Sequence, residues 1–252
     1  MLAGRIRSMG AAHWLSLFGV ILLGWIALWF MSVPAEMRAL SRIYGADFWV
    51  SLCLATPDIT GYPKLLLMWS LMSAAMMLPT ALPSFATYED LGASAETNFP
   101  ALVAGYLTIW LGFAAIAAAL QIGFMRLGLL DGLGSSRSAV FSAVLLLIAG
   151  GYQFSKLKDA CLSKCRMPLT FFMQHWEEGA FAMGLRLGAV CLGCCWALML
   201  LGFVGGVMSL GFMGLATIIM IFEKLPELGR FISAPLGVIL IASAPVVLLF
   251  GM

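Results

Sequence analysis

The chain has 252 residues, of which 62% are hydrophobic and only 10% are charged, and its mean hydropathy is +1.02. These values lie far outside the range of a soluble globular domain. The formal net charge of +2 is too small and too dispersed to indicate a nucleic-acid partner, and the chain has no basic tail. The composition therefore predicts an all-α, polytopic transmembrane helix bundle whose main partner is the lipid bilayer.

The first predicted helix covers residues 12–33. Its charged leader, MLAGRIRSMG, is typical of a signal peptide, but the apolar run that follows is long enough to span a bilayer and has no small-x-small cleavage site. We therefore expect a retained helix. Three further apolar stretches follow, and they predict helices over residues 64–86, 99–125 and 137–157.

The region after residue 179 is longer than one span. Leu187 to Phe222 contains no charged residue, and as one helix it would run about 54 Å against a hydrocarbon core of about 30 Å. GFVGG at 202–206 is the natural break. The sequence thus predicts helices over 180–201, 207–223 and 231–250, which makes about seven in a single domain of residues 1–252. The sixth is short, so a re-entrant hairpin is the alternative there.

The distribution of Lys and Arg favours a cytoplasmic N-terminus. With that orientation the inner side carries Arg5, Arg7, Lys156, Lys158, Lys164, Arg166, Lys224 and Arg230, and the outer side carries Arg38, Arg42, Lys64, Arg126 and Arg137. The loop that contains KDACLSKCRMPLTFFMQHWEEG then faces the cytoplasm, where thiols stay reduced. We expect the charges at span ends, including Glu223 and Lys224, to be solvated.

Five of the six cysteines fall between positions 161 and 195. CLSKC places Cys161 and Cys165 four residues apart, and CLGCC places Cys191, Cys194 and Cys195 at i, i+3 and i+4. On a helix either spacing puts the sulfur atoms on one face. Soft sulfur ligands inside a membrane select Cu(I), or zinc if an imidazole is added.

Methionines form a second candidate group. Met72 and Met76 lie on one face of the second predicted helix with Met77 beside them, and Met72 is expected at about the depth of Cys191. Met208 could extend a thioether path, and His175 is the imidazole nearest the cysteines in sequence. The candidate metal ligands are Met72, Met76, Met77, Cys161, Cys165, His175, Cys191, Cys194, Cys195 and Met208. Methionine and free cysteine also fill helix interfaces, so simple packing is the alternative.

Known catalytic motifs are missing from the sequence. There is no G-x-S-x-G, no H-E-x-x-H and no Walker loop, the last predicted helix has no lysine for a retinal Schiff base, and two histidines are too few for paired haem ligation. No carboxylate lies mid-span, as a proton-coupled transporter would require. We assign no catalytic residue, and the pattern favours a protein that is not an enzyme.

Four segments together resemble a family of bacterial predicted metal-binding integral membrane proteins, a domain of unknown function. They are MWSLMSAAMMLPTALP, GGYQFSKLKDACLSKCRMP, GLRLGAVCLGCCWALM and GVMSLGFMGLATIIMIFEKLP, with CLxxCRxP and CxGCCWxLM as the specific motifs. The resemblance implies the bacterial inner membrane, a protein partner in a membrane complex, and metal handling by the methionines and cysteines named above. The chain departs from the family pattern in two places, the first at one residue and the second at two. Leu187 replaces the histidine of H-G-x-x-C, and Ser209 and Phe212 replace Asn and Trp.

Three hypotheses follow from the sequence. The first is a copper site used for transport or for delivery to a partner. The second is an accessory structural subunit with an eroded metal site and no cofactor, which the missing histidine and the small-residue faces at Gly202, Gly206, Gly211 and Gly214 favour. The third is thiol–disulfide exchange, although its usual C-x-x-C motif is a C-x-x-x-C here.

Overall fold

A computed structural model describes residues 11–32, 58, 60–92 and 97–251 of the chain. Within those ranges every regular element is a helix, and only one isolated β-bridge, between Leu130 and Ser136, joins two extended residues. The all-α helical bundle is therefore confirmed. Arg5, Arg7, Arg38 and Arg42, which entered the count of positive charges, lie outside the described residues.

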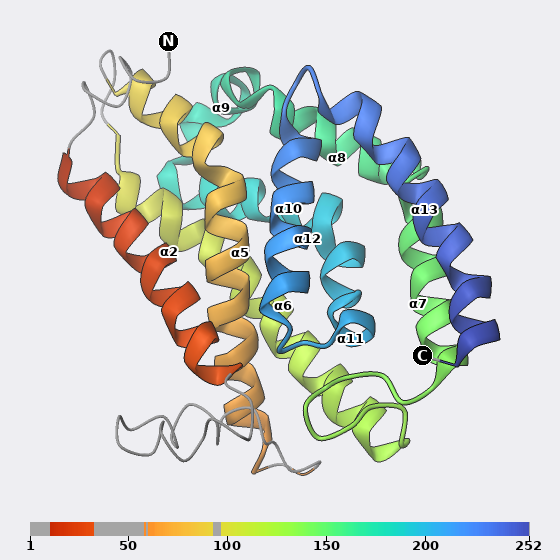
Figure 1. The fold of residues 1–252 in the computed structure, drawn as a ribbon. Coiled ribbons are helices and arrows are strands. Elements are labelled where there is room, and N and C mark those ends of the chain that lie inside the picture. The colour runs from red at the N-terminus through yellow and green to blue at the C-terminus, as the bar shows by residue number, and fades with distance from the viewer. Residues whose placement is uncertain (1–10, 33–57, 59, 93–96, 252) are drawn as a thin grey trace.

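Among the described elements, α2, α5, α6, α7, α10, α12 and α13 run up and down the bundle in alternating directions, and α8 and α9 lie at one end of it (Figure 1). The elements are α2 (Ala11–Met31), α5 (Tyr62–Leu91), α6 (Phe99–Arg126), α7 (Ala139–Tyr152), α8 (Lys156–Arg166), α9 (Pro168–His175), the 3₁₀ turn η3 (Trp176–Glu178), α10 (Ala180–Leu200), α11 (Gly202–Gly205), α12 (Leu210–Lys224) and α13 (Gly229–Phe250).

In the part of the chain that the structure describes, five segments are long and apolar enough to cross a membrane: His13–Met31, Tyr62–Leu91, Phe99–Arg126, Ala180–Gly205 and Phe231–Phe250. A sixth results if α7 and α8, which meet at an angle of 61°, form one broken span. α12 has 15 residues and a length of about 22 Å, which is less than a hydrocarbon core of about 30 Å. The molecule is thus compatible with a multi-pass membrane protein.

The predicted helix over residues 137–157 is shorter than expected. α7 ends at Tyr152, and a new helix begins after Ser155, whose side chain accepts a hydrogen bond from the backbone N–H of Lys158 as an N-cap. Cys161 and Cys165 therefore lie on a separate helix, α8, and the segment expected to be a loop is largely helical. The GFVGG break occurs where predicted, because Gly206 turns the chain at φ +87°.

The backbones of α6 and α10 come into close contact where the two helices cross. A Cβ added to Gly184 would lie 2.1 Å from the carbonyl oxygen of Leu102, and one added to Gly105 would lie 2.2 Å from the carbonyl oxygen of Phe181. Gly184 and Gly188 form a G-x-x-x-G pair, the spacing that lets two helix backbones touch. The predicted small-residue faces differ: a Cβ on Gly211 or Gly214 would meet no atom within 4 Å.

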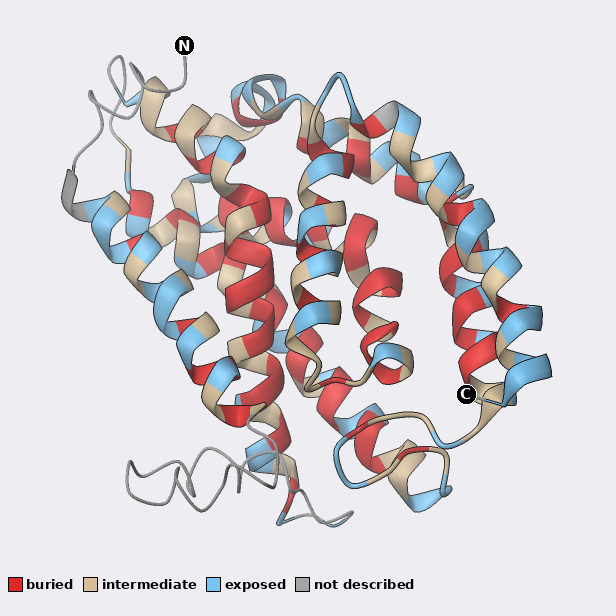
Figure 2. Cartoon of the chain, viewed as in Figure 1, coloured by how far each residue is buried: buried red, intermediate tan, exposed pale blue. Residues whose placement is uncertain are grey.

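Burial follows this arrangement (Figure 2). The span windows of α5 and α10 are each 61% buried, whereas those of α2 and α13 are 28% and 11% buried. Large apolar side chains cover the outward faces of these peripheral helices, among them Leu15, Leu23, Phe231 and Leu249. Lipid is the medium that suits such a surface.

Candidate metal centre

Three cysteine thiols from α10 meet in the interior of the bundle. The sulfur atoms of Cys191, Cys194 and Cys195 all lie within 4.8 Å of one another, and each residue is only 1% exposed. The Cys194 and Cys195 sulfurs are 3.2 Å apart, and the Cys194 thiol donates to the Cys191 carbonyl oxygen at 3.1 Å. The i, i+3, i+4 spacing thus places these thiols on one face, as expected. We call this group the thiol triad.

The thiol triad fits a soft metal ion. With a metal–sulfur bond of about 2.3 Å, two thiolates on opposite sides of an ion would lie about 4.6 Å apart, and three around it would lie about 4 Å apart. Sulfur atoms already within 4.8 Å can therefore bind an ion with little rearrangement. Among the described residues the group that could hold a metal contains thiols alone, and Leu187, one turn before Cys191, is buried.

Side chains from two other helices contact the Cys191 sulfur, and each of them is also hydrogen-bonded to α5. The Lys224 ammonium at the end of α12 donates to the Cys191 sulfur at 2.9 Å and to the Thr80 hydroxyl of α5 at 2.7 Å. The Tyr106 hydroxyl of α6 lies 3.1 Å from the same sulfur and donates to the carbonyl oxygen of Met77 at 3.0 Å. The thiol triad is therefore joined to α5, α6 and α12 by polar contacts.

The expectation that Glu223 and Lys224 are solvated is wrong. Glu223 is 1% exposed and Lys224 8% exposed. The Glu223 carboxylate receives two hydrogen bonds of 2.8 Å from Lys158, which is 1% exposed. In the sequence, Glu223 and Lys224 directly follow 36 uncharged residues, and this position is a signal that they lie inside the bundle. Their burial also depends on α8, which packs over the end of α12.

The second cysteine pair faces the thiol triad from α8. The Cys165 thiol is buried and lies close to Cys194. The Cys161 sulfur packs against Gly193, where an added Cβ would lie 2.6 Å away. Both thiols thus approach α10, and all the cysteines in the described part of the chain are free thiols.

The other predicted ligands lie in varied places. Met72, Met76 and Met77 are buried in α5. α5 is connected to the thiol triad through the Met77 carbonyl oxygen and the Thr80 hydroxyl. Met72 lies about 7 Å from Met77 along the helix axis. Met208 precedes α12, about 20 Å from Lys224 at the other end of that helix. The His175 ring nitrogen Nδ1 is 2.8 Å from the carbonyl oxygen of Phe171 on its own helix.

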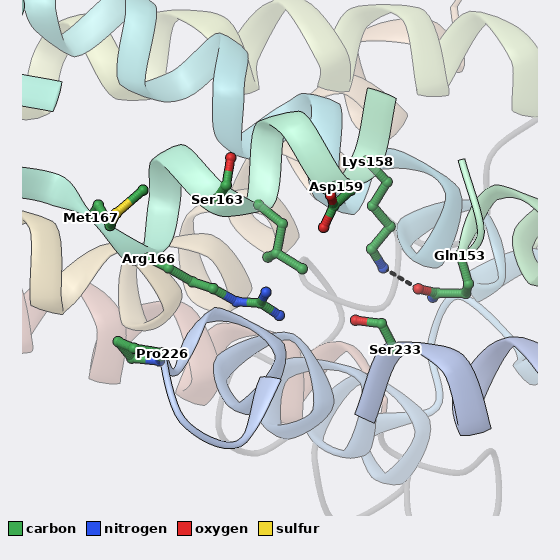
Figure 3. A pocket seen from close by; sticks show the side chains of 9 residues that line it. Gln153, Lys158, Asp159, Ser163, Arg166, Met167, Pro226 and Ser233 are labelled. Carbon is green, nitrogen blue, oxygen red and sulfur yellow. Dashed lines mark hydrogen bonds between the residues drawn. The ribbon is translucent and has the colours of Figure 1, made fainter. Parts of the chain in front are cut away.

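A polar cavity of about 510 Å³ lies between α8 and the start of α13. Figure 3 shows Arg166 and Lys158 extending from α8 into this region, with Pro226 and Ser233 across from them and Lys158 bonded to the Gln153 side chain. Lys158 also binds Glu223, the residue next to Lys224. The two neighbouring residues at the end of α12 therefore point to different sites, Glu223 to a lysine that lines the cavity and Lys224 to the thiol triad.

Comparison with known proteins gives one positive finding. Residues 66–247, more than half of the chain, match the model of the PpoB2 family, described as a copper chaperone. The chain belongs to the PpoB2 copper chaperone family. Neither the curated proteins nor the solved structures contain a match to it.

PpoB2 membership agrees with the chemistry of the thiol triad. The matched range contains all of α6 through α12 and most of α5 and α13, so it includes the thiol triad together with Tyr106 and Lys224. A buried set of thiols is suited to a soft metal, and copper is the metal that the family description names. A metal-handling role for this PpoB2 member is therefore supported by both its family and its donor set.

Proposed function

We propose that this protein binds Cu(I) through Cys191, Cys194 and Cys195 within the membrane and holds the ion for transport or for delivery to a protein partner. The observation that carries the proposal is the burial of three thiols whose sulfur atoms lie within 4.8 Å of one another. Cu(I) is cargo in this role and no reaction is catalysed.

The donor set favours copper over zinc. Structural zinc sites have four ligands, and catalytic zinc sites usually include imidazole or carboxylate ligands. The thiol triad supplies three sulfurs, and Leu187 stands where the family pattern has an imidazole. Cu(I) is stable with two or three thiolates, so the exchange of histidine for leucine leaves a Cu(I) site intact.

Delivery to a partner is the part of the proposal that the chaperone family supports. Cys161 and Cys165 extend the thiols from the triad toward the end of the bundle where α8 lies. Thiols in series allow Cu(I) to move by exchange of one sulfur ligand for the next. We place the protein in a bacterial inner membrane with its N-terminus in the cytoplasm, as the distribution of positive charges favours.

An accessory subunit without a metal is the second candidate. The open faces at Gly211 and Gly214 favour it, because nothing within the described chain covers them. The close approach of the three buried sulfur atoms favours copper binding over it, because packing alone does not require thiols to meet one another.

Cu(I) titration of the reduced, detergent-purified protein against a chromophoric Cu(I) chelator tests the proposal. We expect about one Cu(I) per chain, with an X-ray absorption spectrum that contains sulfur ligands only. Cys191→Ser combined with Cys195→Ser should abolish this binding. Cys161→Ser is the matched control, because it removes a thiol that lies outside the triad.

Two outcomes would refute the copper proposal. One is sub-stoichiometric Cu(I) in the unmodified reduced protein. The other is full binding by the folded double variant, which would move the ion away from the thiol triad. A native pull-down in the same preparation addresses the accessory role, because a chain that migrates without any stable partner contradicts that role.

A further inference from the structure

Lys224 brings a buried positive charge to the thiol triad. Its ammonium contacts the Cys191 sulfur and the Thr80 hydroxyl, both neutral groups when protonated. None of the ion pairs among the described residues involves Lys224. A buried ammonium without a carboxylate is costly, so the negative charge that balances it has to come from the sulfur atoms themselves.

The structure fixes Lys224 in this position through its neighbour. The side-chain carboxylate of Glu223 is bound by Lys158. The backbone carbonyl oxygen of Glu223 accepts two hydrogen bonds, of 3.0 and 2.8 Å, from the guanidinium of Arg166. These contacts attach the last turn of α12 to α8. Consecutive helix residues point about 100° apart, so Lys224 is directed away from α8 and toward α10 and α5.

We propose that Lys224 is the residue that makes the thiol triad selective for monovalent soft ions. The inference rests on the proposed function, because it requires a metal ion on the triad thiols. When Cys191 and Cys195 bind as thiolates and Cys194 stays a thiol that donates to the Cys191 carbonyl oxygen, the two thiolates, one monovalent ion and the Lys224 ammonium sum to zero charge. With a divalent ion the same group carries a charge of +1, which is disfavoured in a buried site.

Removal of the ammonium reverses this balance. Without Lys224 a bis-thiolate complex of a monovalent ion carries a charge of −1, whereas the complex of a divalent ion is neutral. A lysine that served only as a packing element would make no such distinction, because its loss would weaken the binding of both ions alike. The relative preference for two ions therefore reports the charge of Lys224 separately from the integrity of the fold.

Ag(I) and Hg(II) are suitable probes, because both bind two thiolates in line and they differ by one unit of charge. The reduced, detergent-purified full chain is equilibrated with both ions, buffered by excess glutathione. The bound Ag:Hg ratio is then measured by mass spectrometry of the metals. The variants are Lys224→Met, Lys224→Gln and Lys224→Arg, with Lys156→Met, which removes an exposed lysine of α8, as the control.

We expect Lys224→Met and Lys224→Gln to lower the bound Ag:Hg ratio about tenfold or more relative to the unmodified chain, since one full charge is removed at contact distance. Lys224→Arg and Lys156→Met should leave the ratio within about twofold of the unmodified chain, because both keep a cation beside the triad. Lys224→Gln keeps a polar group of intermediate length, so it provides a folded neutral variant if Lys224→Met aggregates.

An unchanged Ag:Hg ratio in either folded neutral variant would overturn the role of Lys224 and leave the copper site standing. An equal loss of both ions from the neutral variants would also overturn it, since that result indicates a structural role. Failure of the unmodified chain to bind either ion at Cys191 and Cys195 would overturn the proposed function itself. The two failures are therefore distinguishable.

Discussion

Tyr106 shows how a single hydroxyl links the metal centre to the rest of the bundle. Its ring is buried between Phe85, with ring centroids 5.4 Å apart, and Trp110, at 6.4 Å. Its hydroxyl connects the Cys191 sulfur to the backbone of α5. The hydroxyl supports the sulfur, and we assign it no role as a metal ligand.

We predict that Tyr106→Phe lowers the free energy of unfolding by about 1 kcal/mol, the value of a typical buried hydrogen bond. The Met77 carbonyl oxygen remains satisfied, because the Thr80 hydroxyl also donates to it at 2.9 Å. Cu(I) stoichiometry should not change. Unfolding in detergent and chelator competition measure the two effects, with Tyr62→Phe as a control that removes a similar bond to the Ala115 carbonyl oxygen. Loss of copper from folded Tyr106→Phe would contradict this assignment.

The Lys158–Glu223 ion pair is a second feature at the scale of single residues. Both side chains are 2% exposed. We predict that Lys158→Met destabilises the fold by about 3–5 kcal/mol, because it leaves a buried carboxylate without its partner. The double variant Lys158→Met with Glu223→Leu should recover part of that loss. Denaturant unfolding measures the stability of both variants, with Lys156→Met, a substitution of an exposed lysine, as the control. If Lys158→Met is as stable as Lys156→Met, the predicted cost of breaking the ion pair is contradicted.

At the scale of helices, the α6–α10 crossing positions the metal centre. Tyr106 follows Gly105 in α6, and Cys191 lies three residues after Gly188 in α10. The glycines bring the two backbones together, so they also bring the tyrosine hydroxyl within reach of the cysteine sulfur. The distance between the two helices thus determines how the triad is surrounded.

We predict that Gly184→Ala destabilises the protein by about 2 kcal/mol or more, because the new methyl group would lie 2.1 Å from a backbone oxygen and the helices must move apart. Gly211→Ala is the matched control, since the added methyl group meets no atom of the described chain. Thermal unfolding in detergent distinguishes them. Equal melting temperatures for the two variants would contradict the close crossing.

The helices show how far the sequence alone leads. Apolar runs of span length predict most of the helices, and the i, i+3, i+4 spacing predicts the thiol triad, because both are local properties. The break after Tyr152 was missed, although Ser155 is a recognisable N-cap. Thr80, Tyr106 and Lys224 were also missed as parts of the centre. Each comes from a different helix, and only the tertiary packing brings them to Cys191.

At the scale of the whole molecule, the alternating helices place the beginning of α2 and the end of α13 at opposite ends of the bundle (Figure 1). The same result follows from five spans or from seven, whereas six spans would put both ends on one side. α7 and α12 are the short members of the alternating set, with 14 and 15 residues. At about 21–22 Å they are shorter than a hydrocarbon core of about 30 Å, so they reach across it only if the bilayer thins locally or the segments at their ends enter the hydrocarbon.

We predict that tags fused before α2 and after α13 lie on opposite sides of the membrane. Protease treatment of sealed inner-membrane vesicles should digest one tag and spare the other until detergent is added. A cytoplasmic N-terminus predicts that the tag before α2 is the one digested in inverted vesicles. Digestion of both tags without detergent would indicate an even number of spans.

The close crossing of α6 and α10 also bears on the order in which the molecule comes apart when heated. Regions with little burial open locally at a lower free energy than regions that share a packed interface. The span window of α13 is 11% buried and that of α10 is 61% buried. The outer helix should therefore exchange its amide hydrogens first, while the backbone under the cysteines stays protected until the whole bundle melts. A bound ion would then be among the last things that the heated protein releases.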